Sequence, residues 1–384
     1  MSTLWCVSLL GLVCATCGAA AADETKPLIG AIRWDAWHVA GEGSPVKAME
    51  RSLGPKQYHY RLPFFAKVVS ESEVRIDGYT QKIVDQEIAY AKAGGIDYWA
   101  FLLYDPDSPM SQGLSLYLSS KRKKDVRFCA IASPNVFRNA EQFPKKMQRV
   151  VDLMAEPTYQ KVAGDRPLLY LFGVSDEWLQ AWGGEANAKR LFDGLRAAVK
   201  ARGLKEPYIV VMDFHPAHGK NAADAIGAEA ISTYATAGGA KGRTPYATLT
   251  SNAKHFWDSC ASTGAQVVPT AMAGWDRRPR VEHPVPWQKN QKPGEGIEKY
   301  FQMPTPKELA AHIEDAMRWV IAKPDRCPAQ TIIIYAWNEH DEGGWLCPTL
   351  SEGPARLDAI SKLLRPSRLA CTSAASPNTA PARP

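Results

Sequence analysis

The sequence predicts a single (β/α)8 TIM barrel, an α/β fold. Eight short runs of apolar and β-branched residues alternate with stretches of helical periodicity. Such runs are typical of strands that are buried on both faces, as in parallel sheets covered by helices. No linker divides residues 28 to 350 into halves, which favours one barrel over a doubly wound sheet.

The predicted strands are bounded by Gly, Pro or Asp. In chain order they are Leu28–Trp34, Tyr98–Leu103, Arg127–Ile131, Pro167–Leu171, Tyr208–Met212, Ala230–Ser232, Val267–Ala271 and Thr331–Ala336. In a barrel of parallel strands all the carboxyl ends meet at one mouth, where ligands and catalytic groups collect.

Two of the intervening helices carry end signals. The apolar face of Ile83–Ala91 is followed by Gly94–Gly95, which is a typical helix C-cap. Before the last strand, Thr305, Pro306 and Glu308 supply an N-cap, a first-turn proline and the acid of a capping box. These signals predict helices that lead into the second and the eighth strand.

The two ends of the chain are predicted to lie outside the barrel. Residues 1–22 contain no Lys, Arg, Asp or Glu, and a mostly apolar segment is followed by Ala20, Ala21 and Ala22 before Asp23, as in a secretory signal peptide. Residues 366–384 are rich in Pro, Ala, Ser and Thr and are predicted to be disordered. The catalytic domain is then residues 23–365. We expect a secreted or periplasmic protein that has no membrane segment once the signal is removed.

Charge and cysteine usage exclude several functions. The net charge of +6 is spread along the chain, and the basic run Lys121–Lys124 is typical of a solvated surface, so we expect no nucleic-acid partner. No CxxC pair remains after the signal peptide to suggest zinc or redox chemistry. Cys327 and Cys347 flank the last strand, and the sequence leaves open whether they form a disulfide.

Carboxylates and aromatic side chains gather at the predicted strand ends. Aromatic faces stack on sugar rings and carboxylates bond their hydroxyl groups, so this mixture suits a carbohydrate. The sequence shows no GxGxxG motif and no P-loop, and we expect no cofactor. The candidate substrate-binding residues from this inventory are Trp34, Asp35, Trp37, His38, Tyr104, Asp105, Asn135, Asp213, His215, Tyr234, Trp275 and Asp276.

One of these strand ends carries residue types that can bind a metal ion. Asp213, His215 and His218 have a spacing that could ligate a metal ion. A hydrogen-bonded polar loop around Pro216 is the more ordinary interpretation of the same residues, so no metal is predicted.

Glu339 and Glu342 are the candidate catalytic residues. They follow the eighth strand three positions apart, so a tight turn can point both into the mouth. Two carboxylates are the minimum for glycoside hydrolysis, because one protonates the leaving oxygen and the other acts as nucleophile or base. The alternative is that both acids are solvated or cap the next helix.

The segment "YAWNEHDEGGWLCPTL" resembles the strand-eight region of the glycoside hydrolase family 99-like, or WbsX-like, barrels (glycoside hydrolase family 71/99-like). "DQEIAYAKAGGIDYWAFLLY", "ISTYA" and "VVPTAMAGWDRRPR" resemble the second, sixth and seventh strand regions of that group. The resemblance implies the same barrel and an enzyme acting on α-mannoside-type links, or a transferase or hydrolase of another sugar. It also adds Arg280 to the substrate-binding residues. Asn338 and His340, which flank Glu339, join them because they are placed to hydrogen-bond the developing charges.

The resemblance further implies a retaining reaction with divided roles. Glu342 would protonate the leaving oxygen, and Glu339 would deprotonate the 2-hydroxyl of the sugar, which attacks the anomeric carbon. Asp341 beside Glu342 is expected to raise its proton affinity. The chain departs from the family in having His340 and Asp341 between the glutamates and Arg33, Trp34 and Asp35 at the first strand end, so the sugar is less certain than the chemistry.

Three functional classes therefore follow from the sequence. A secreted glycoside hydrolase requires both glutamates and no nucleotide donor. A glycosyltransferase would require a site for a nucleotide or lipid-phosphate donor. The sequence shows no phosphate-binding loop, and only the basic pair Arg277 and Arg278 supports this class. A non-catalytic carbohydrate-binding barrel would keep the aromatic residues without needing both acids. The oligomeric state, the linkage and endo or exo action do not follow from the sequence.

Overall fold

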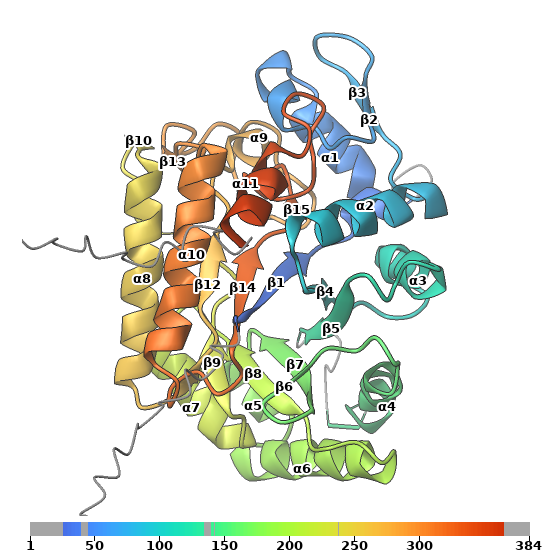
Figure 1. The fold of residues 1–384 in the computed structure, drawn as a ribbon, viewed down its shortest axis with the longest axis vertical. Helices are drawn as coiled ribbons and strands as arrows, with labels where there is room; N and C mark the ends of the chain where they lie inside the picture. The colour runs from blue at the N-terminus through green and yellow to red at the C-terminus, as the bar shows by residue number, and fades with distance from the viewer. Residues whose placement is uncertain (1–25, 40–44, 134–139, 142, 237, 365–384) are drawn as a thin grey trace, which may run out of the picture.

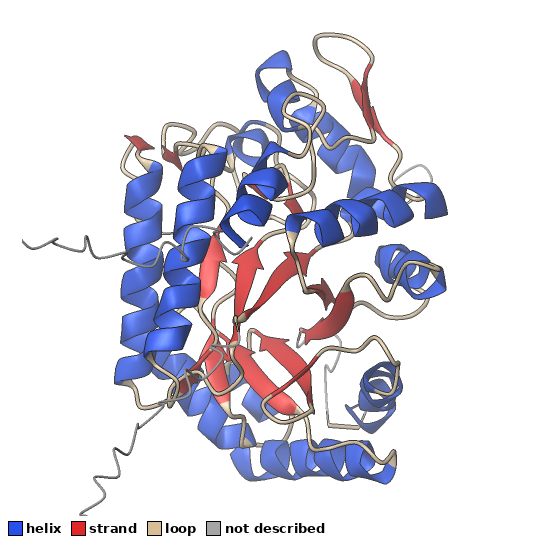
Figure 2. Cartoon of the chain, in the orientation of Figure 1, coloured by secondary structure: helices blue, strands red, loops and turns tan. Residues whose placement is uncertain are grey.

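The computed structural model describes residues 26–39, 45–133, 140–141, 143–236 and 238–364. The predicted signal peptide, the C-terminal tail and Asn135 lie outside these residues. Within them, the strands form the centre of the molecule and the helices surround it (Figure 1 and Figure 2).

All eight predicted strands are present, with ends that differ from the prediction by at most two residues. Parallel pairing runs from each strand to the next along the chain and from the last strand back to the first. The barrel strands are β1 (Leu28–Arg33), β4 (Tyr98–Leu102), β5 (Arg127–Ala132), β7 (Arg166–Phe172), β8 (Tyr208–Met212), β9 (Ala230–Ser232), β11 (Gln266–Val267), β12 (Thr270–Met272) and β14 (Thr331–Tyr335).

The predicted seventh strand is split in two, and its two halves close the barrel. β11 pairs with β9 and β12 pairs with β14, so the two ends of the sheet are consecutive in the chain. The two residues between these halves form hydrogen bonds to both neighbouring strands. Val268 N donates to Ile231 O of β9 at 3.1 Å, and Pro269 O accepts from Ile333 N of β14 at 3.0 Å. Pro269 has no N–H to give to a ladder, which accounts for the break.

Helices connect the strands on the outside of the barrel. α2 ends at Gly95, whose φ of 81° is the left-handed C-cap that the sequence predicts, and Thr305 with Glu308 forms the predicted capping box at the start of α10. The helices are α1 (Pro45–Leu53), α2 (Gln81–Gly94), α3 (Gln112–Ser119), α4 (Phe143–Met154), α5 (Asp176–Ala181), α6 (Glu185–Ala201), α7 (Pro216–Ile226), α8 (Tyr246–Ser262), α9 (Arg278–Glu282), α10 (Pro306–Ala322) and α11 (Ala355–Leu364).

Short elements decorate the loops. Three 3-10 turns follow β1, α1 and β4: η1 (Ala36–His38), η2 (Lys56–Arg61) and η3 (Pro109–Ser111). The small strands are β2 (Ala66–Val68), β3 (Val74–Ile76), β6 (Lys161–Val162), β10 (Arg243–Thr244), β13 (Tyr300–Phe301), β15 (Asn338–Glu339) and β16 (Gly344–Trp345). The β15–β16 hairpin places the two candidate catalytic acids at the mouth.

Cys327 and Cys347 are both buried free thiols, so the structure contains no bridge between them. Cys327 precedes β14 and Cys347 follows β16. The two cysteines therefore lie at opposite ends of the barrel, about one strand length apart.

Candidate active site

Glu339 and Glu342 are held by a tight antiparallel hairpin just after β14. Asn338 pairs with Trp345 and Glu339 pairs with Gly344. Glu342 N donates to Glu339 O at 3.2 Å across the turn. The hairpin therefore fixes the backbone positions of both acids at the mouth of the barrel.

One guanidinium group joins three carboxylates. Arg280 Nη2 lies 3.2 Å from Glu339 Oε2, and Arg280 Nη1 lies 2.5 Å from Glu342 Oε1. The Nε atom of the same side chain donates to Asp341. Because Nη1 and Nη2 belong to one planar group, the two glutamates lie on neighbouring edges of a single side chain.

Two tyrosines and a second arginine complete the contacts of the glutamates. The Tyr234 hydroxyl donates to Glu339 Oε1 at 3.1 Å. The Tyr335 hydroxyl donates to Glu342 Oε2, and Arg277 Nε lies 3.1 Å from Glu342 Oε1. Glu339 thus has one tyrosine and one arginine, whereas Glu342 has one tyrosine and two arginines.

This difference in surroundings separates the two acids electrostatically. Burial raises the pKa of Glu339 well above its ordinary value, the neighbouring negative charge of Glu342 raises it further, and Arg280 opposes the rise only in part. Glu339 therefore holds its proton to higher pH than a solvated glutamate. The like charge expected from Asp341 on Glu342 is compensated, because Asp341 is bound to Arg280.

The two acids and Arg280 line one cavity of about 410 Å³. Its remaining walls are apolar or aromatic, and they come from the last residues of β4 and β7 and from several loops. These residues are Trp34, Pro45, Leu102, Tyr104, Met110, Phe172, Tyr234 and Trp287. The site is thus a largely apolar pocket with a few convergent polar groups, the usual character of a small-molecule site.

Trp34 is locked into the wall of this cavity. Asn338 Nδ2 donates to Trp34 O at 2.7 Å and Asn338 Oδ1 accepts from Trp34 N at 2.9 Å, so this residue positions the wall. The indole Nε1 of Trp34 donates to the Tyr104 hydroxyl at 2.8 Å. Trp287 packs edge-on against Trp34 at 5.6 Å and is 42% exposed, which leaves much of its surface open to a ligand.

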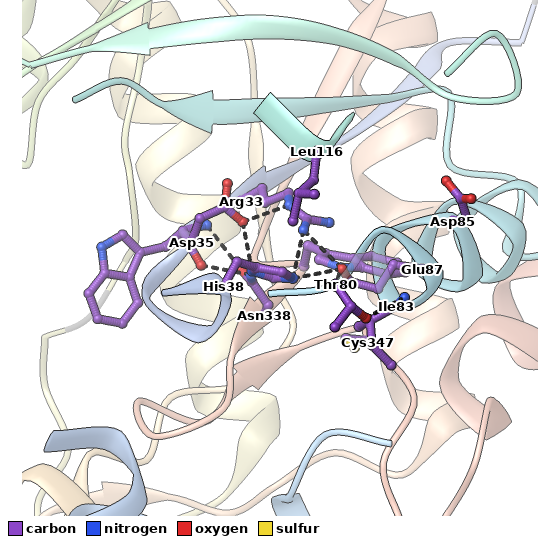
Figure 3. Close-up of polar contacts among 12 residues, drawn as sticks. Arg33, Asp35, His38, Thr80, Ile83, Asp85, Glu87, Leu116, Asn338 and Cys347 are labelled. Atoms are coloured by element: carbon purple, nitrogen blue, oxygen red, sulfur yellow. Dashed lines mark hydrogen bonds and ion pairs between the residues drawn. The ribbon is translucent and has the colours of Figure 1, made fainter. Parts of the chain in front are cut away.

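The predicted residues beside Trp34 face away from the cavity. Arg33 Nε lies 2.8 Å from Asp35 Oδ1, and Glu87 of α2 lies 2.9 Å from both Arg33 Nη2 and His38 Nε2 (Figure 3). Trp37 is fully buried. Asp35, Trp37 and His38 therefore do not line the cavity. Asp35 and His38 belong to the buried polar cluster with Arg33 and Glu87 of α2, and Trp37 packs against His340.

Other predicted residues lie outside the cavity for equally local reasons. Asp105 is exposed and forms an ion pair with Lys146. Asp213 Oδ1 accepts from His215 N at 2.7 Å, and its Oδ2 lies 2.6 Å from His218 Nδ1, which is the polar-loop arrangement at the start of α7. Among the described residues, no three His, Cys, Asp or Glu side chains are placed to hold a metal ion.

Asp276 and His340 are structural rather than exposed to the cavity. Asp276 is fully buried, with Arg61 at 2.6 Å and Arg278 at 2.7 Å. His340 is enclosed by Trp37 and Trp345, its Nδ1 donates to Arg61 O at 2.7 Å, and burial lowers its pKa to about 3. His340 is therefore neutral. Contrary to the expectation from the sequence, it does not line the cavity.

Trp275 lies behind the acids and not in the cavity wall. Its ring centroid is 5.4 Å from that of Tyr335, the residue whose hydroxyl binds Glu342. The tryptophans that line the cavity are Trp34 and Trp287, and not the predicted Trp275.

Several residues of the site were missed in the sequence. Leu102, Phe172 and Tyr335 are the last residues of their strands, so the rule for strand ends would have found them if it had included the final strand position. Trp287 and Arg277 lie in the long connection after β12, and only the folded path of that connection brings them to Trp34 and Glu342.

No protein-family model and no curated protein matches this sequence. Among solved structures, two of the most similar are of the GH99 endo-α-mannosidase from Bacteroides thetaiotaomicron, one of them in complex with Bis-Tris-propane. They are 14% and 13% identical, each covers 87% of this chain and 95% or 96% of the other, and the TM-score is 0.54 for both. The neighbours are glycoside hydrolases, and at this identity the similarity establishes the α/β barrel fold.

No helix among the described residues is both long enough and apolar enough to cross a bilayer.

Proposed function

We propose that this protein is an exported, retaining glycoside hydrolase that cleaves a poly- or oligosaccharide, with Glu339 and Glu342 as its catalytic acids. The observation that carries the proposal is that both carboxylates line one aromatic-walled cavity at the barrel mouth while bound to the same guanidinium. The Bacteroides endo-α-mannosidase, which shares the fold, supports an α-mannoside-type link as the first substrate to test.

We assign the retaining course on the resemblance of the hairpin residues to the family 99-like group, in which the sugar's own 2-hydroxyl attacks the anomeric carbon. Both carboxylates lie within bonding distance of the terminal nitrogens of Arg280, which holds the two acids at one guanidinium.

The surroundings of each acid support a division of labour. Glu339, with its raised pKa, is a base strong enough to draw the proton from a sugar 2-hydroxyl as that oxygen attacks the anomeric carbon. Glu342 protonates the leaving oxygen. Because the raised pKa of Glu339 places a single shared proton on Glu339 first, the reaction requires this proton to pass to Glu342, which leaves Glu339 ionised.

Tyr234, Tyr335 and Arg280 then act as positioning residues. Tyr335 orients one oxygen of Glu342, and Arg280 moderates the negative charge of the pair. The aromatic walls at Trp34 and Trp287 offer faces on which sugar rings stack.

A polysaccharide and oligosaccharide panel with product analysis tests the proposal. Wild-type protein should release reducing sugar from at least one α-linked substrate with retention of configuration, without any nucleotide donor. Glu339→Gln and Glu342→Gln should each abolish the release. Sugar transfer only in the presence of a nucleotide or lipid-phosphate donor would instead identify a glycosyltransferase, and binding unaffected by both substitutions would identify a non-catalytic carbohydrate-binding barrel.

A further inference from the structure

A second cavity, of about 500 Å³, lies on the rim of the barrel between the start of α7 and the middle of α8. The loop after β8 contributes Phe214 and His215 to its lining. The face of α8 contributes Asn252, His255, Phe256 and Ser259. The proposed reaction makes no use of these six side chains.

One wall separates this rim cavity from the cavity of the glutamates. The ring of Phe172, which lines the glutamate cavity, lies 4.8 Å from Tyr234 and 5.9 Å from Phe214, centroid to centroid. The loop after β9 also serves both cavities, because Tyr234 lines the first and Ala235 lines the second. A continuous row of aromatic rings therefore leads from Glu339 to the rim cavity.

The lining of the rim cavity is aromatic and polar, and it includes the imidazole rings of His215 and His255. Among the described residues that line it there is no Asp, Glu, Lys or Arg. Phe214 is 52% exposed and offers a free aromatic surface, while the side chains of Asn252 and Ser259 offer an amide and a hydroxyl. Such a lining fits the apolar face and the hydroxyl groups of a neutral sugar, and it supplies no pair of acids that could cleave one.

We propose that the rim cavity binds an uncharged sugar unit of the same saccharide chain whose scissile bond lies between Glu339 and Glu342. This assignment rests on the proposed function, and the occupant follows from the shared wall of Phe172 and Tyr234. The chain crosses the wall over Phe172, and Phe214 stacks on the distal unit. Longer saccharides therefore bind more tightly than short ones through a contact remote from the reacting atoms.

The test is a calorimetric titration in a Glu339→Gln/Glu342→Gln background, in which the saccharide stays intact. The probes are mono-, di- and tetrasaccharides of α-mannosyl, α-glucosyl and β-glucosyl linkage. Phe214→Ala removes the aromatic face and Phe214→Tyr retains it. Since Phe214 is half-exposed, circular dichroism should show both variants folded.

In the series that binds, Phe214→Ala should lower the affinity for the tetrasaccharide by about 2- to 10-fold and leave the affinity for the monosaccharide unchanged. Phe214→Tyr should restore the affinity for the tetrasaccharide. Equal affinity of Phe214→Ala and its parent for the tetrasaccharide, an equal loss for all lengths, or no binding by any series would overturn the assignment. Wild-type hydrolysis of the panel is a separate readout. Its absence alongside a Phe214-dependent affinity would contradict the proposed reaction and not the rim cavity.

Discussion

The backbone amide of Asp276 donates to the carbonyl of Glu342 at 2.7 Å, which joins the connection after β12 to the hairpin after β14. The two backbones approach this closely because glycines stand at the contact. A Cβ atom at Gly343 would lie 2.4 Å from Asp276 N, and one at Gly274 would lie 2.2 Å from Gly343 O. This junction brings Arg277 and Arg280 to the acids.

Gly343→Ala should therefore damage both stability and activity. Gly343 has a φ of 88°, which costs a residue with a Cβ about 1 to 2 kcal/mol, and here the added methyl must also push Asp276 away. Displacing Glu342 by about 1 Å is enough to lower activity about 10²-fold. Thermal unfolding and hydrolysis rates of the variant would measure the two effects.

Gly353→Ala is the matched control. Gly353 also has a positive φ, of 54°, but a Cβ there would meet no atom within 4 Å. Gly353→Ala should lose stability only through the strain of the backbone conformation, and it should keep its activity. If Gly343→Ala were no worse than Gly353→Ala, the contact with Asp276 would not hold the site together.

With an activated aryl glycoside, which hardly needs a proton from Glu342, the pH dependence of kcat/KM should report the raised pKa of Glu339. As a base, Glu339 must be ionised, so activity should rise as pH increases through a pKa well above the ordinary 4.5 of glutamate. Arg280 lowers that pKa, so Arg280→Gln should move the acidic limb of the profile to higher pH. Since Glu342 raises it, Glu342→Gln should move the limb to lower pH when an activated aryl glycoside is the substrate. An acidic limb that stays in place in both variants would show that Glu339 does not set it.

Glu87 should contribute to stability above about pH 4.5. Burial opposes its ionisation, but the positive charges of Arg33 and His38 outweigh burial and lower its pKa to about 2. A carboxyl whose folded pKa is depressed stabilises the fold above its unfolded pKa and loses this contribution as pH falls toward the folded one. Glu87→Gln should cost about 3 to 5 kcal/mol at pH 7, because, among the described residues, Asp35 is then the one carboxylate left beside the two buried side chains of Arg33 and His38.

Denaturant titrations of Glu87→Gln at several pH values would measure this loss. The difference from wild type should shrink between about pH 4.5 and 2. Glu71→Gln removes the ion pair of Glu71 with Lys56, in which both side chains are exposed, and should leave stability unchanged. A pH-independent difference for Glu87→Gln would mean that lost packing, and not charge, accounts for it.

The fold could be predicted from the sequence because each strand and cap depends on neighbouring residues. The run Thr331–Tyr335 is fully buried in the structure, as its β-branched composition indicates, and Gly95 ends α2 with the left-handed conformation that glycine favours. The split of the seventh strand at Pro269 was not predicted, because the run was judged by its hydrophobicity alone. The proline inside the run was the signal for the split.

The site could be predicted only in part. The rule that residues after a strand face the mouth found Trp34 and Tyr234 but also Asp35 and Trp37, which are buried outside the cavity. Asp35 pairs with Arg33, and Trp37 lies in the 3-10 turn η1 and packs against His340. Asp35 pairs with Arg33, which also pairs with Glu87, a residue 54 positions along the chain from Arg33, so the placement of Asp35 involves a distant contact. The contact of Trp287 with Trp34 likewise depends on the path of a long connection.

The most direct test of the assigned roles is the response of the two glutamine variants to leaving-group quality. Both should be measured on one sugar carried by a poor leaving group and by an activated aryl leaving group. Glu342→Gln should lose about 10²-fold or more with the poor leaving group and far less with the activated one, because only the former needs a proton. Glu339→Gln should lose activity equally on both, because both require attack by the 2-hydroxyl. The same response of the two variants, or leaving-group dependence confined to Glu339→Gln, would contradict the account.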